Sequence, residues 1–238
     1  AQQLTGEHDF GWLVVDYEAL YAQAQRSAPD RRTYRFARRP GADVFSVPDQ
    51  EGLDRSYSFV DETVLTAGLD LSFLLFGDEE DPFRPTVKVG AFASQIDRTA
   101  GEQRFRFTPA SGADRRDPVV EEIFDPDRVG EDLLDIRDNS ILGADDYEGS
   151  SEILAAYAMA DIGILDIFRI VGGVRWESAV YELRAFQLAQ GGGGGTVQVE
   201  SGFDQTELLP AAAVTWFILE ELQLRAAYGR TVSRPVFN

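Results

Sequence analysis

Residue types that usually perform catalysis are scarce in this chain. Cysteine is absent, and the single histidine, His8, lies near the amino-terminal end. No Gly-x-Ser-x-Gly segment is present to supply the nucleophile of a Ser-His-Asp arrangement. Without cysteine, neither a disulfide nor a thiolate metal site can form. We therefore predict that the chain is not an enzyme and that it holds no cofactor and no metal.

Two segments share only their composition with known ligand-binding loops. The glycine run at residues 191–195 lacks the strand-to-helix context and the trailing Lys-Ser/Thr of a phosphate loop, so it predicts a flexible loop. In the acidic segment at residues 108–147, three residues match positions 1, 3 and 6 of a calcium loop: Asp125, Asp127 and Gly130. The residues at positions 5 and 12 do not fit: Val129 and Ile136. A solvated acidic loop is favoured, with incidental Ca²⁺ binding as the alternative.

The informative charged residues stand opposite rows of apolar residues. Between residues 62 and 95, apolar residues at 65, 67, 69, 71 and 73 alternate with small or polar ones that include Asp70. After the polar turn at residues 77–82, the same alternation resumes from Val87 to Ala93, and its polar side carries Lys88. A period of two residues is typical of a strand with two different faces. The stretch therefore predicts an antiparallel hairpin with one apolar and one polar face.

The same pattern continues through the chain. Strands are expected at residues 2–10, 13–36, 55–76, 83–107, 148–164, 167–186, 203–219 and 222–235. Three long connections are expected at residues 37–54, 108–147 and 187–202, the second with a helical turn near 127–134, and the other connections are short. Strict alternation of short and long connections is typical of a transmembrane barrel. The predicted fold class is therefore all-β, an antiparallel barrel segment of about eight long strands.

Composition narrows the functional classes. The net charge of −19 over 238 residues argues against nucleic acid as a partner, because phosphates require a basic surface. No apolar run reaches the roughly 18 residues of a membrane helix. Residues 1–12 lack a basic start and an apolar core, so no signal peptide is expected within this sequence. Several aromatic residues fall near predicted strand ends, as in interfacial girdles: Trp12, Tyr21, Phe73, Phe168, Trp176, Trp216 and Tyr228. A soluble β-sandwich remains the alternative.

Residues 206–237, TELLPAAAVTWFILEELQLRAAYGRTVSRPVF, resemble the late-barrel signature of TonB-dependent outer-membrane receptors. In this signature a Leu-Pro strand, here Leu209 and Pro210, is followed by a short turn and a Leu-Arg-Ala-Ala-Tyr-Gly-Arg-Thr-x-x-Arg-Pro strand, here residues 224–235. Residues 155–162 and 170–177 are similar to the family, and so are residues 19–36. The resemblance covers nearly the whole chain.

The resemblance implies that residues 1–238 are part of a barrel in the bacterial outer membrane. The family's plug domain, its TonB box and the final strands are not found in this sequence, and the family barrel has 22 strands. The implied function is TonB-dependent uptake of a scarce nutrient, either a ferric siderophore, cobalamin or an oligosaccharide. The implied partners are membrane lipid, the protein's own plug domain, the TonB complex acting through the plug, and that small-molecule ligand. Alternatives are a passive pore or small structural outer-membrane barrel, and a soluble β-rich carbohydrate-binding domain.

Two sets of residues are the candidate functional residues. Eight are expected to face the lumen, where they form its hydrated polar wall or contact the plug: Asp16, Glu18, Asp70, Lys88, Arg169, Arg175, Glu177 and Arg225. Five arginines on the extracellular side are candidates for binding an anionic ligand: Arg31, Arg32, Arg35, Arg104 and Arg106.

Overall fold

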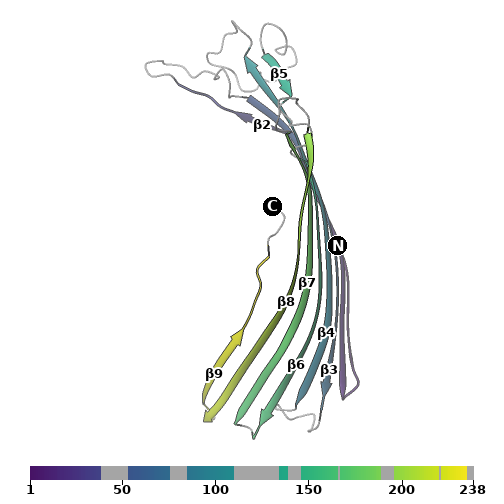
Figure 1. Ribbon diagram of the computed structural model, residues 1–238, viewed down its shortest axis with the longest axis vertical. Coiled ribbons are helices and arrows are strands. Elements are labelled where there is room, and N and C mark those ends of the chain that lie inside the picture. Colours follow the sequence, from purple (N-terminus) through teal and green to yellow (C-terminus); the bar gives the residue numbers. More distant parts are fainter. Residues whose placement is uncertain are drawn as a thin grey trace.

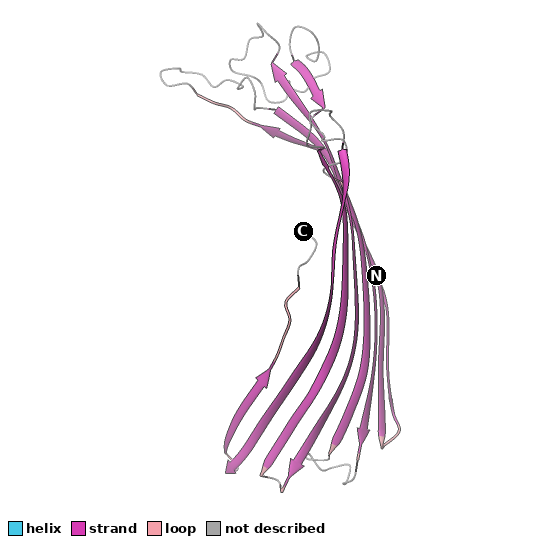
Figure 2. Cartoon of the chain, in the orientation of Figure 1, coloured by secondary structure: helices cyan, strands magenta, loops and turns pink. Residues whose placement is uncertain are grey.

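The computed structural model describes residues 1–38, 53–75, 85–109, 134–138, 146–165, 167–188, 196–219 and 221–234. Throughout these ranges the regular structure is β, and the strands lie side by side in one curved and twisted layer (Figures 1 and 2). All pairings are antiparallel. The predicted all-β, antiparallel fold class is confirmed. None of the described residues forms a helix long and apolar enough to cross a membrane.

The strands follow one another along the sheet in chain order, with a single exception. They are β1 (Gln2–Asp9), β2 (Leu13–Tyr34), β3 (Leu53–Leu74), β4 (Thr86–Pro109), β5 (Leu134–Asp138), β6 (Tyr147–Ile164), β7 (Phe168–Leu188), β8 (Thr196–Leu219) and β9 (Leu222–Gly229). The path is β1-β2-β3-β4-β6-β7-β8-β9, and the short β5 pairs with the outer end of β4 beside it.

The structure corrects three details of the sequence prediction. The acidic segment contains β5, which was not expected. The strand predicted from residue 203 begins seven residues earlier, at Thr196, so the connection predicted at residues 187–202 is too long. The strand predicted to reach residue 235 ends at Gly229. The glycine run at 191–195, the calcium-like residues at 125–130 and the helical turn expected near 127–134 lie outside the described residues.

One layer of strands leaves the apolar rows without a packed interior. The accessible surface is 16394 Å², whereas a folded soluble monomer of 26.4 kDa exposes about 10,600 Å². Apolar side chains on the same face of β3, β7 and β8 stay exposed, for example Leu69 at 44%, Val174 at 40% and Leu208 at 55%. A sandwich would bury these rows between two sheets. The soluble β-sandwich alternative is therefore wrong for the described residues.

Pro210 explains where β9 leaves the sheet. The Arg230 amide donates to the Pro210 carbonyl at 3.0 Å, and this is the last contact of the β8–β9 ladder. In an antiparallel pair the amide and carbonyl of one residue point toward the same neighbour, so the missing N–H of Pro210 faces Arg230. Because Pro210 has no N–H to donate to Arg230, the ladder ends here. Figure 1 shows the chain moving away from β8 beyond β9.

Candidate functional site

The polar face of the sheet holds all eight residues expected to face a lumen. Residues directly opposite one another in a β-ladder point to the same side of the sheet. Asp16, Asp70, Gly90, Tyr157 and Arg175 are successive partners across β2, β3, β4, β6 and β7, so they form one row. The register places the other predicted members on the same face: Glu18, Lys88, Arg169, Glu177 and Arg225.

Asp70 is the centre of the first cluster on this polar face. The Tyr157 hydroxyl donates a hydrogen bond of 2.5 Å to Asp70 Oδ1, and Lys88 Nζ lies 3.1 Å from Asp70 Oδ2. These three side chains come from β6, β3 and β4. Tyr157 reaches Asp70 over the backbone of Gly90, where a side chain would fill the space between them. The absence of a Cβ at residue 90 therefore allows this contact.

Glu177 is the centre of a second cluster. Arg175 Nε donates to Glu177 Oε1 at 2.6 Å, and Arg234 Nη1 lies 2.5 Å from Glu177 Oε2. The Glu177 residue is 8% exposed, which makes it one of three buried polar residues in the described part of the chain. Arg175 also lies over the ring of Phe92, 5.7 Å from its centroid. Two guanidinium groups thus share one covered carboxylate, an arrangement that offsets the cost of burying its charge.

A hollow of about 510 Å³ lies on the polar face beside these clusters. Its lining includes Asp70, Tyr157 and Arg175, together with carboxylates from β1 and β2: Glu7, Asp16 and Glu18. Asp70 is neutralised by Lys88. Among the described residues, no side chain forms an ion pair with Asp16 or Glu18, so the hollow carries an excess of negative charge.

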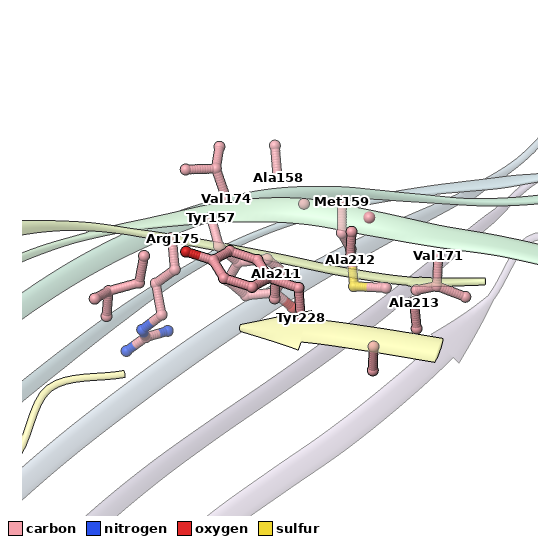
Figure 3. Close-up of a pocket in the computed structure, with 14 residues that line it drawn as sticks. Tyr157, Ala158, Met159, Val171, Val174, Arg175, Ala211, Ala212, Ala213 and Tyr228 are labelled. Atoms are coloured by element: carbon pink, nitrogen blue, oxygen red, sulfur yellow. The ribbon is translucent and has the colours of Figure 1, made fainter. Parts of the chain in front are cut away.

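A second hollow, of about 380 Å³, differs in chemistry and is shown in Figure 3. Small and apolar residues of β6, β7, β8 and β9 line it, including Met159, Val171 and Ala211. Tyr157 and Arg175 border both hollows. The polar face therefore presents an acidic surface and an apolar surface that meet at these two side chains.

The remaining predicted members lie near the tight turns. Arg169 on β7 pairs with Asp161 on β6, with Nη2 2.5 Å from Oδ2. Arg225 on β9 donates to the Gln223 side chain at 3.3 Å. The structure does not bring these two arginines together with the Asp70 or Glu177 clusters.

The five candidate arginines lie near the outer ends of β2 and β4. Four of them are within these strands, and Arg35 follows the end of β2. Arg31 and Arg104 both oppose Ser56, so they share a face, and Arg106 follows on that face. Arg104 pairs with Glu102 at 2.8 Å and Arg106 with Asp54 at 2.9 Å. Arg32 opposes Arg55 on the other face, and Arg35 follows the end of β2.

Asp30 organises the arginines of that other face. A bulge interrupts the β2–β3 register between Ala28 and Arg31, and Asp30 within it has a φ of 61°. Arg32 Nη2 lies 2.7 Å from Asp30 Oδ2, and Arg55 Nε donates to Asp30 Oδ1. Hydrogen bonds from Arg32 and then Arg55 lower the pKa of the Asp30 carboxyl to about 2. The same contact with Asp30 raises the pKa of Arg32.

The opposite, apolar face has the dimensions of a lipid-facing surface. On β7 it presents Phe168, Ile170, Val174 and Trp176, all exposed, with Gly172 between them. These positions span nine residues along the strand, and a transmembrane strand needs roughly 9–11. Aromatic pairs near the tight-turn end include Phe168–Trp216, whose centroids are 5.8 Å apart, and Trp12–Phe73 at 6.2 Å. Six of the strands have 18 to 24 residues, so they continue well beyond such a band.

Sequence reasoning missed several members of the polar face. Tyr157, Asp161, Phe92 and Glu207 were not selected, although their parity along β6, β4 and β8 places them there. That parity was the signal that would have found them. Arg234 was noted only as part of a motif, because its contact with Glu177 joins residues 57 positions apart and no local pattern reveals it.

Comparison with known proteins identifies a family of β-barrels and solved structures of similar fold. The sequence model of a family described as TonB dependent receptor-like, beta-barrel, matches residues 2–238. The fold is similar to the ferric-catecholate import receptor Fiu of E. coli K12 in its open form, with 12% identity and a TM-score of 0.57 over 95% of this chain and 34% of that one. The closed form gives 14% identity and a TM-score of 0.53 over 95% and 32%.

The siderophore receptor PiuA from Acinetobacter baumannii is also similar, with 14% identity and a TM-score of 0.50 over 92% of this chain and 30% of that one. The chain thus spans about a third of the length of each solved receptor that it matches. A search of curated proteins found no match.

Proposed function

Because the chain belongs to the family of TonB-dependent receptor-like β-barrels, we propose that it forms part of the wall of a receptor that imports a scarce nutrient. The family is located in the bacterial outer membrane and consists of transporters rather than enzymes. The apolar face would contact lipid, and the polar face, with the Asp70 and Glu177 clusters, would line the lumen. The contrast between these two faces is the observation that carries the proposal.

The chain spans about a third of the receptors that it matches, and a complete receptor would have further parts. A plug domain inside the lumen would contact the polar face, and the TonB complex would transmit energy through the plug. The acidic hollow beside Asp16 and Glu18 supports a contact with basic groups of the plug, since carboxylates without ion pairs attract cations. We therefore assign the eight polar-face residues to wall and plug contact.

The ligand proposed first is a ferric siderophore. The names of the matched receptors, a ferric-catecholate import receptor and a siderophore receptor, motivate this choice. Arg31, Arg104 and Arg106, which share the polar side of the outer strand ends, would attract an anionic chelate. Cobalamin and oligosaccharides are the other ligand classes.

Uptake measurements on the full-length receptor test the proposal. The receptor is expressed in a bacterium that lacks its own siderophore receptors, and entry of radioactive iron bound to a catecholate chelate is followed. We expect saturable uptake that stops when TonB is deleted or the proton gradient is collapsed. Uptake that continues without TonB would replace the proposal by a passive pore. TonB-dependent uptake of cobalamin or an oligosaccharide instead of iron would keep the transport function and change the ligand.

A further inference from the structure

Residues 230–234, here called the strap, leave the sheet and cross its polar face. The Arg230 amide still bonds to the Pro210 carbonyl of β8. The Arg230 side chain then reaches Glu207 of β8, with Nη2 2.5 Å from Oε2. Four residues later, Arg234 contacts Glu177 of β7 at 2.5 Å. Glu177 and Glu207 are ladder partners on the polar face. The strap therefore runs from β9 toward β7 over the face that the proposed function places in the lumen.

The two ion pairs of the strap differ in burial. The Arg230 side chain is 54% exposed and that of Glu207 is 19% exposed. The Arg234 side chain is 13% exposed and that of Glu177 is 10% exposed. An exposed pair contributes little, whereas removal of one partner from a covered pair leaves the other charge uncompensated. The Arg234–Glu177 contact is therefore the one of the two that is better shielded from solvent.

The Arg234–Glu177 contact is a close ion pair that lacks hydrogen-bond geometry. Among the described residues, Glu177 Oε2 and Arg234 Nε and Nη2 are covered and have no hydrogen-bond partner. A bidentate guanidinium–carboxylate pair would use two parallel N–H groups. Glu177 also accepts a bond from Arg175, so it keeps a cationic partner if Arg234 leaves. Movement of the strap away from the sheet would therefore leave Glu177 paired with Arg175.

We propose that the strap narrows the passage along the polar face, and that Arg234 and Glu177 are positioning residues that hold it closed. The proposal rests on the proposed function only in taking the polar face as the lumen wall. Arg175 links this latch to the acidic hollow, because it bonds Glu177 and also lines that hollow. A cationic ligand or plug group that competes for Glu177 would release the strap.

Thiol labelling tests the latch directly. The sequence has no cysteine, so Val232→Cys places a single reactive thiol of this chain on the strap. The full-length receptor is expressed in intact cells and labelled with a membrane-impermeant maleimide. Addition of Glu177→Gln should speed labelling about tenfold or more, because Arg234 loses its charged partner. Glu207→Gln, which breaks the exposed pair with Arg230, is the matched control and should change the rate less than about twofold.

A charge exchange separates a latch from a general loosening of the barrel. Glu177→Arg combined with Arg234→Glu should restore slow labelling, whereas Glu177→Arg alone should not. If Glu177→Gln prevents folding, Arg234→Lys replaces it as the opening variant, since lysine keeps the charge and loses the planar guanidinium. Retained heat-modifiable migration in gels shows that each variant is folded.

Two results would overturn the latch. One is an unchanged labelling rate in a folded Glu177→Gln or Arg234→Lys variant, and the other is a charge exchange that labels as fast as the single variant. Neither depends on iron uptake. A loss of TonB dependence with intact latch behaviour would contradict the proposed function alone.

Discussion

Tyr157 on β6 donates its hydroxyl to Asp70 on β3, at 2.5 Å, across the whole width of the intervening strand β4. Gly90 of β4 lies directly beneath this contact. A Cβ at residue 90 would come within 2.3 Å of both Asp70 Oδ1 and Tyr157 Cε1. One glycine thus allows two strands that are not neighbours to be joined by a side-chain hydrogen bond.

Gly90→Ala should therefore break the Tyr157–Asp70 hydrogen bond. We expect a loss of about 1–3 kcal/mol in the free energy of unfolding, because a hydrogen bond to a charged group is removed. Tyr157→Phe should cost a similar amount, and the double variant should cost little more than either alone. Urea unfolding of the full-length receptor in lipid vesicles measures each value. Gly172→Ala is the control, since the nearest atoms to its added Cβ lie at 3.8 Å. Full additivity of the two changes would show that they act on different contacts.

The assignment of the two faces predicts opposite effects for neighbouring residues. Ala158 lies on the apolar face in the same row as Val174, and Met159 follows on the polar face beside Lys88. If the apolar face contacts lipid as proposed, Ala158→Arg should destabilise the inserted barrel by up to about 2–4 kcal/mol, the cost of an arginine on the lipid side near the bilayer midplane. Met159→Arg should cost much less, because Met159 lies on the polar face beside Lys88. Folding yield into vesicles and the urea midpoint provide the comparison. Equal costs for both variants would argue against a lipid-facing row at Ala158.

The outer end of β2 should respond to acid. Asp30 has a folded-state pKa of about 2, below its ordinary value of 3.8, because Arg32 and Arg55 donate to its carboxylate. A lowered pKa contributes stability that is present above about pH 4 and lost as the pH falls toward about 2. Amide hydrogen exchange in residues 28–34 should accelerate over this window, beyond the intrinsic effect of pH.

Asp30→Asn is the control for this pH effect. Asparagine tolerates the positive φ at residue 30, so the bulge is kept while the charge is removed. The variant should show the faster exchange at all pH values between about 2 and 5 and should have no transition of its own in that range. A transition that persists in Asp30→Asn would assign it to another group.

Two outer arginines should control the affinity for an anionic chelate. Arg31 and Arg104 flank Ser56 on one face of β2, β3 and β4. Replacement of either by glutamine should raise the half-saturation concentration for uptake about two- to tenfold, which corresponds to about 0.4–1.4 kcal/mol. The maximal rate should stay unchanged, since the contact is made before transport. Arg184→Gln, on an exposed pair with Glu200 elsewhere, is the matched control. An effect of equal size in Arg184→Gln would indicate general electrostatic attraction.

The fold was predictable because the sequence of each long strand shows which residues face the apolar side and which face the polar side. Apolar and polar residues alternate within β3, β4 and β7, so face and parity could be read locally. The end of β9 could not, because it depends on the missing N–H of Pro210 in the neighbouring strand. The strand β5 was likewise missed, since the ladder partner that the described residues give it is the outer end of β4.

For the candidate site, the sequence likewise predicted the face on which each residue lies but not the contacts between residues. Parity was enough to place Asp70, Lys88 and Glu177 on one face. It did not show which of them meet, because contacts such as Tyr157–Asp70 and Arg234–Glu177 depend on the relative register of several strands. The roles of these residues in plug contact and ligand passage stay predictions.

The order of strands in the sheet also bears on how such a wall changes over evolutionary time. Within the described part of the chain, and apart from β5, each strand pairs with the strands next to it in chain order. If recombination inserted a hairpin, its two strands could pair with the strands on either side. If a hairpin were lost, the two strands beside it could pair with each other, and in both cases the pairing of all other hairpins would be preserved. Because barrel diameter grows with strand number, pore width can be inherited in steps of two strands.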